Sequence, residues 1–122
     1  MGSAQRGISP KQYDGSEMIE KLNSKNFSQN LNSEFKLLTE NAQPLPLRLT
    51  EVTERNAGPK VEQFSLFFVG PETPVLQQGI YHLQHEKLGE FDLFLVPLGI
   101  DNEGVRYECA FNRFRQQETS NA

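Results

Sequence analysis

The most constraining feature of this sequence is a period-two alternation of apolar residues, which recurs between Phe64 and Arg113 and is interrupted by turn-forming segments. Successive side chains of an extended strand point to opposite faces of a sheet, so this alternation is typical of β-strands. The connections contain Gly, Pro, Asp and Asn, and none of them has the pattern of a crossover helix. Short connections join antiparallel strands. The stretch therefore predicts an antiparallel sheet.

The complete chain predicts six strands and one short helix. The strands are expected at residues 34–40, 44–54, 62–69, 79–85, 91–97 and 105–114. The helix is expected at 16–23 with Ser16 as its N-cap, followed by a helical turn in which Phe27 and Leu31 plug one end of the domain. The expected fold class is all-β, an antiparallel meander rolled into a small barrel or sandwich, with a flat sheet covered by the helix as the alternative.

The length of 122 residues predicts one domain with a single core. We expect a loosely attached tail at 1–15, a β domain with an N-terminal helix at 16–114, and a frayed tail at 115–122.

Composition argues against several classes of function. The net charge is −4 and there is no basic stripe, so no nucleic-acid partner is expected. No apolar run approaches the roughly 20 residues that span a bilayer, and the N-terminus has no signal peptide, so neither a membrane nor an export route is expected. The single cysteine, Cys109, cannot form an intrachain disulfide. A cytoplasmic location is the resulting expectation.

The residues with chemical potential have structural interpretations. His82 and His85 are three apart on one strand and should point to opposite faces, which prevents them from ligating one ion together. Cys109 is expected to be a buried thiol, and Asp101 to Gly104 a hairpin turn. The sequence therefore predicts no catalytic residues, no metal site, no cofactor and no enzymatic activity.

Two of the predicted strands are apolar on both faces. If Phe64, Leu66 and Phe68 face the core, alternation places other apolar side chains on the outer face. These outer residues are Phe67, Val69, Phe94 and Val96. Either the N-terminal helix or the tails cover them, or they form an exposed patch that binds another protein or a second copy of the chain. A ligand pocket inside the barrel is a third alternative, which the many large inward side chains disfavour.

The motifs F-S-L, G-P, Q-G-x-Y-x-L-x-H, L-G, L-F-L-V-P-x-G and Y-E-x-x-F-N occur in this order between Phe64 and Asn112. In this pattern the chain resembles a family of small uncharacterised bacterial all-β proteins. The resemblance implies a small β domain without an established activity, and an association of relatives with phage-tail-like structural proteins. It marks six polar residues as candidates for any shared role: Gln78, Tyr81, His85, Tyr107, Glu108 and Asn112.

These observations lead to two functional hypotheses. The first is a non-enzymatic structural or protein-interaction module that associates through the second apolar face, either with a protein partner or with itself. The alternative is a small-molecule-binding or catalytic β-barrel with a polar site near His85, Tyr107 and Glu108.

Overall fold

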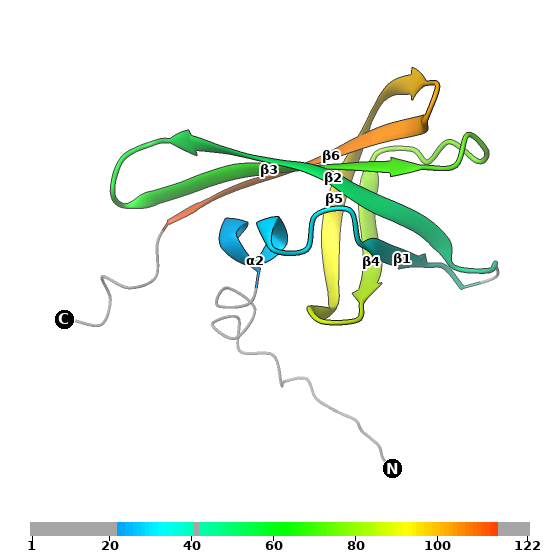
Figure 1. Cartoon of the computed structure of the whole chain (residues 1–122), viewed down its shortest axis with the longest axis horizontal. Coiled ribbons are helices and arrows are strands. Elements are labelled where there is room, and N and C mark those ends of the chain that lie inside the picture. The colour runs from blue at the N-terminus through cyan, green and yellow to red at the C-terminus, as the bar shows by residue number, and fades with distance from the viewer. Residues whose placement is uncertain (1–21, 41, 115–122) are drawn as a thin grey trace, which may run out of the picture.

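The computed structural model describes residues 22–40 and 42–114, and it consists of six antiparallel strands and a short helix (Figure 1). The elements are α2 (Ser24–Ser28), β1 (Glu34–Leu38), β2 (Leu45–Asn56), β3 (Val61–Gly70), β4 (Gly79–His85), β5 (Gly89–Asp101) and β6 (Gly104–Phe114). The predicted fold class is confirmed. The expected tails at 1–15 and 115–122 and positions 16–21 of the expected helix lie outside the described residues.

The strands form a closed ring in the order β1-β2-β3-β6-β5-β4, with β4 paired to β1. In the expected meander each strand pairs with the next strand along the chain. In the structure β3 pairs with β6 instead, and the connection after β3 crosses over to β4, which pairs with β1. The β3–β4 connection, residues 71–78, is long enough for that crossing. The β4–β5 and β5–β6 connections are tight turns that lead into Gly89 and Gly104, the first residues of β5 and β6, and both glycines have the positive φ that favours this residue.

The interior of the ring is filled by the inward-facing side chains of all six strands. The alternation predicted for β3 and β5 is confirmed, since Phe64, Leu66 and Phe68 are buried, as are the inward residues of β5. Phe35 and Phe68 meet edge to face, with ring centroids 5.3 Å apart. Several inward residues have no exposed surface, among them Leu37, Leu47, Leu49, Leu83, Leu95 and Tyr107.

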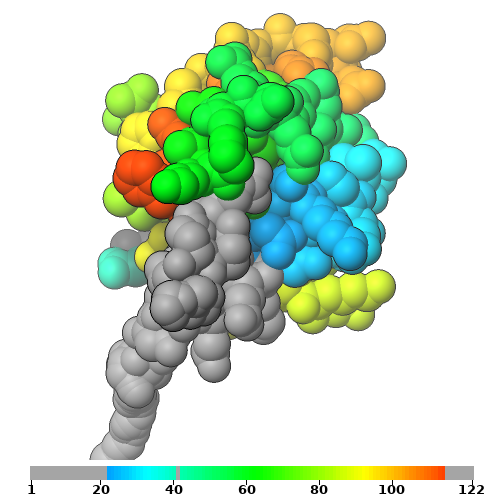
Figure 2. Space-filling view, turned by 90° about the vertical axis from the view of Figure 1, so that its left-hand side faces the viewer, coloured from blue at the N-terminus to red at the C-terminus, as the bar shows by residue number. Residues whose placement is uncertain are grey.

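Helix α2 closes one end of this core. Asn23 caps it, its side-chain oxygen accepting a hydrogen bond from the backbone N–H of Asn26 at 2.8 Å. Phe27 is fully buried, and its ring centroid lies 5.9–6.3 Å from those of four other phenylalanines: Phe35, Phe64, Phe91 and Phe111. Figure 2 shows α2, in blue, directly below the green β2 and β3 strands. The expected plug is confirmed for Phe27 but is wrong for Leu31, which is 42% exposed.

The Phe27 plug gives a matched test of the core. Phe27→Ala should lower the free energy of unfolding by about 3–4 kcal/mol, because it leaves a cavity among four rings. Leu31→Ala, four residues later and in the turn after α2, should change it by less than about 0.5 kcal/mol. Urea unfolding followed by circular dichroism measures both values, and equal effects of the two substitutions would contradict the plug.

Candidate functional site

Two exposed apolar side chains lie next to each other on the outer face of the β4–β5 hairpin. Other exposed apolar residues of the strands are Leu98 and Ile100 in β5 and Phe114 in β6. Ile80 and Phe94 are direct cross-strand partners and are 71% and 47% exposed. Val96, two residues after Phe94 on the same face, is half-buried. Ile80 and Phe94 together are called the Ile80–Phe94 face below. Cross-strand partners have Cβ atoms about 5 Å apart, so the two side chains form one continuous apolar surface.

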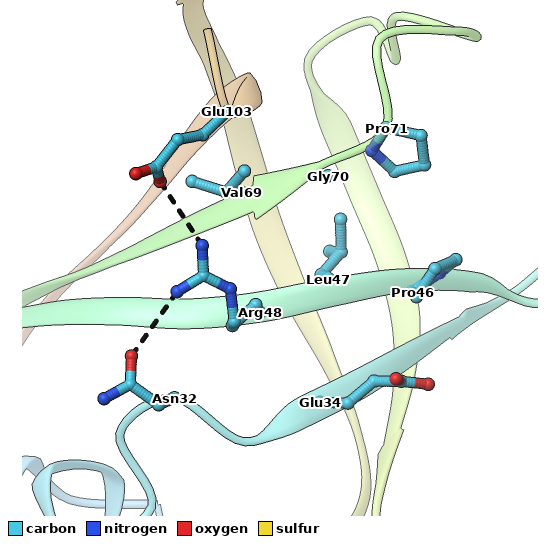
Figure 3. Close-up of a pocket in the computed structure, with 9 residues that line it drawn as sticks. All are labelled: Asn32, Glu34, Pro46, Leu47, Arg48, Val69, Gly70, Pro71 and Glu103. Carbon is cyan, nitrogen blue, oxygen red and sulfur yellow. Dashed lines mark hydrogen bonds and ion pairs between the residues drawn. The ribbon is translucent and has the colours of Figure 1, made fainter. Parts of the chain in front are cut away.

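The four residues predicted to form an interaction surface have different environments. Phe94 and Val96 belong to the β4–β5 hairpin, as described. Phe67 is half-buried, and the guanidinium carbon of Arg106 lies 5.8 Å from its ring centroid. Val69 is only 7% exposed, so its predicted place in an exposed patch is wrong. Its Cγ1 lies beside Gly104, and Figure 3 places its side chain next to the pair formed by Arg48 and Glu103.

Sequence reasoning missed Ile80, although the β4–β5 turn contains the signal that identifies it. The turn pairs His85 with Gly89, and antiparallel counting from that pair places Ile80 opposite Phe94. Ile80 shares its strand face with His82 and Gln84, so alternation within β4 alone indicates a polar surface. Only the neighbouring strand shows that Ile80 extends the apolar surface.

An acidic cluster around His82 lies beside the Ile80–Phe94 face. The Nδ1 atom of His82 is 2.7 Å from an oxygen of Asp92, and its Nε2 atom is 2.8 Å from an oxygen of Glu90. The hydrogen bond to Glu90 raises the pKa of His82 above its ordinary value of 6.5; desolvation opposes this shift, and the bond to Asp92 adds to it. Because the two carboxylates bind opposite ring nitrogens, they favour an imidazolium and cannot chelate one ion together with the ring.

His85 is the opposite case, a buried neutral histidine that holds a turn. Its Nδ1 atom accepts hydrogen bonds from the backbone N–H groups of Lys87 and Leu88, at 3.0 and 3.2 Å. The proton therefore resides on Nε2, which donates to the hydroxyl oxygen of Ser33 at 2.8 Å. Desolvation lowers the pKa of His85, with Lys87 adding to the shift and Glu86 opposing it.

The Ser33–His85 contact is not arranged as a nucleophile and base. The Ser33 hydroxyl donates to the carbonyl oxygen of Asn30 at 2.5 Å, and the facing nitrogen of His85 carries a proton. A general base would have to accept the serine proton at that nitrogen. The contact fastens the segment before β1 to the β4–β5 turn.

The six polar residues of the family-like pattern are not brought together. The Tyr107 hydroxyl accepts a hydrogen bond from the backbone N–H of Leu76, and the Tyr81 hydroxyl donates to the carbonyl oxygen of Gln77, so both tyrosines hold the 71–78 connection. Glu108 faces outward and accepts a hydrogen bond from Ser65, whereas its neighbour Tyr107 is inside the ring. The remaining members are the buried His85 and two exposed residues, Gln78 and Asn112.

A surface pocket of about 400 Å³ lies between β2 and the β5–β6 turn (Figure 3). Arg48 extends across it and donates to Asn32 at 3.4 Å and to Glu103 at 3.3 Å. Both members of the Arg48–Glu103 pair are well exposed, so the pair contributes at most about 1 kcal/mol. The only guanidinium among the lining residues is thus already neutralised, and its contacts fasten the turn to β2.

The expectation that Cys109 is a buried thiol is confirmed. Burial raises its pKa to about 12, so the thiol is not ionised at neutral pH. Among the described residues, no three His, Cys, Asp or Glu side chains are grouped to hold a metal ion.

Comparison with known families matches residues 22–111 to DUF6916, described as a domain of unknown function. Most of the chain is covered, so the protein belongs to this family. No significant match was found among curated proteins or solved structures. In the part of the chain that the structure describes, no helix has the length and apolar character that crossing a membrane requires.

The two histidines should titrate on opposite sides of pH 6.5. His82 has a raised pKa and His85 a lowered one, and nuclear magnetic resonance of the imidazole protons separates the two curves once His82→Gln has identified one signal. Coincident titration of both rings near pH 6.5 would contradict the described hydrogen bonds.

Opposite effects on stability follow from these shifts. The raised pKa of His82 stabilises the fold fully below pH 6.5, and this contribution is lost as pH rises through the folded pKa. The lowered pKa of His85 gives a contribution that is present above pH 6.5 and lost as pH falls toward the folded pKa. The His82→Gln variant should therefore gain stability relative to wild type as pH rises through this range, as urea unfolding at several pH values would measure.

Proposed function

We propose that this member of the DUF6916 family is a non-enzymatic module that binds a protein through the Ile80–Phe94 face. The observation that supports this proposal best is the exposure of two large apolar side chains that are cross-strand neighbours. Contiguous apolar surface on a folded domain is typical of protein contacts, whereas single exposed apolar residues are common.

Among the described residues, the α2 helix does not provide the intramolecular cover considered for the second apolar face. It packs against β2, with Ser24 donating a hydrogen bond to Glu54, and it inserts Phe27 into the end of the core. At the other outward positions, Arg106 lies over Phe67 and Val69 is buried. Among these outer positions of the described residues, the Ile80–Phe94 face is therefore the most exposed apolar surface.

The mode of binding should be through side chains rather than through a strand edge. The backbone of β4 is paired with β5 from Gly79 to His85 and with β1 from His82 to Gln84, so within this strand only the short segment from Gly79 to Tyr81 has no β1 partner. An added strand needs an unpaired edge. A partner at this face would instead pack on the side chains, as sheets do when they stack.

The geometry gives little support to a ligand-binding or catalytic barrel. Such a site requires His85, Tyr107 and Glu108 to converge, yet Glu108 points outward while Tyr107 is buried in the ring. The hydrogen bonds of His85 are made to a turn and to Ser33. The proposal therefore assigns these residues to the fold, and it includes a bacterial, cytoplasmic setting within a larger assembly, as the sequence resemblance suggests.

Site-specific photo-crosslinking tests the proposal. With p-benzoylphenylalanine at position 94, irradiation of the cells that naturally produce the protein should give a discrete crosslinked product. Ile80→Lys in the same chain should remove that product, because it places a charge in the middle of the apolar face.

Val75 is the matched control position, because it is 50% exposed and lies in the 71–78 connection away from the β4–β5 pairing. The same photo-reactive residue at position 75 should not give that product. Identical products from both positions, or no product from position 94, would refute the proposal.

A further inference from the structure

The register of β4 and β5 points to the identity of the partner: we infer that a second copy of this chain packs on the Ile80–Phe94 face, with β4 of each protomer over β5 of the other. This inference rests on the proposed function, since it names the occupant of the same face. It concerns the outward side chains of one hairpin, and all of them are among the described residues.

The outward residues of the hairpin form three cross-strand rows. Ile80 lies opposite Phe94 and His82 lies opposite Asp92. The third row pairs Gln84 with Glu90. Each row joins two residues of similar or complementary character. The first row has two apolar groups, the second an imidazole and a carboxylate, and the third an amide and a carboxylate.

The two-fold axis of such a dimer is parallel to the strands and lies between the two protomers, over the gap between β4 and β5. It packs each row on the same row of the partner, so that each β4 residue faces the β5 residue of that row. Ile80 then faces the partner's Phe94, and the partner's Ile80 faces Phe94. In the same way His82 faces the partner's Asp92. Symmetric dimers use one patch on both subunits, and this patch is complementary to itself under that operation.

Electrostatics support a second copy because no carboxylate of the three rows faces another carboxylate. The two ring nitrogens of His82 lie 2.8 Å from Glu90 and 2.7 Å from Asp92, and in the dimer the ring also meets the partner's Asp92. The other charged neighbours are Lys36, which extends the Gln84–Glu90 row, and Glu108, which lies opposite Val96. A two-fold axis across the strands would instead place Ile80 against the partner's Ile80.

The decisive experiment exchanges charges between two variants of the full chain. Ile80→Lys and Phe94→Asp should each weaken dimerisation at least about tenfold in a concentration series by analytical ultracentrifugation, because each puts a charge against an apolar residue. Val75→Lys should leave it unchanged. Both face residues are exposed, and thermal unfolding by circular dichroism confirms that each variant is folded.

Mixing the two variants distinguishes the geometry. In the mixed dimer the ammonium group introduced at position 80 faces the carboxylate introduced at position 94, and the other pair keeps its natural residues. The mixture should therefore recover a dimer within about tenfold of the wild-type affinity. Failure of the mixture to associate, with each variant monomeric alone, would overturn the exchanged arrangement.

Two further outcomes separate this inference from the proposed function. A wild-type chain that stays monomeric at all concentrations would overturn the second copy as occupant, while a product crosslinked from position 94 to a different protein would leave the proposed function intact. A dimer that both face variants retain unchanged would overturn the inference, and the absence of crosslinks from position 94 would then overturn the proposed function as well.

Discussion

Closure of the strand ring by the pairing of β1 with β4 is the constraint on which the rest of the structure depends. It involves few residues, with Lys36, Leu37 and Leu38 paired to residues of β4. Because the ring is closed there, strands surround the inward side chains on every side. The α2 helix then covers one end of the ring. Closure also makes β4 an interior strand at His82, Leu83 and Gln84, which leaves only a short unpaired edge at its start, where Ile80 lies.

The enclosed core accounts for the ordinary roles of most chemically interesting residues. Tyr107 fills the interior and holds the β3–β4 connection, and His85 stays neutral because it is desolvated and caps a turn. Cys109 is buried and un-ionised at neutral pH. Outside the ring, the two ring nitrogens of His82 contact the carboxylates of Asp92 and Glu90, next to the apolar pair that we propose as the contact surface.

Local pattern was sufficient to predict the strands, the inward residues and the Phe27 plug, because alternation and turn chemistry act over a few residues. It could not predict the strand order, since the partner of β3 depends on where the 71–78 connection crosses. The same limitation affected the site. Val69 alternates outward like Phe67, but the Gly104 turn and the Arg48–Glu103 pair beside it come from distant segments. Ile80 became visible only through the register of the neighbouring strand.

The central claim is that the Ile80–Phe94 face is a contact surface for a second copy, and the Ile80 methyl group reports on it directly. Ile100 is an internal reference, since it is 59% exposed near the end of β5, outside the β4–β5 pairing. In methyl spectra recorded over a range of protein concentrations, the signal of Ile80 should shift progressively while that of Ile100 stays constant. Equal shifts of both signals, or no shift of Ile80 at any concentration, would contradict the account.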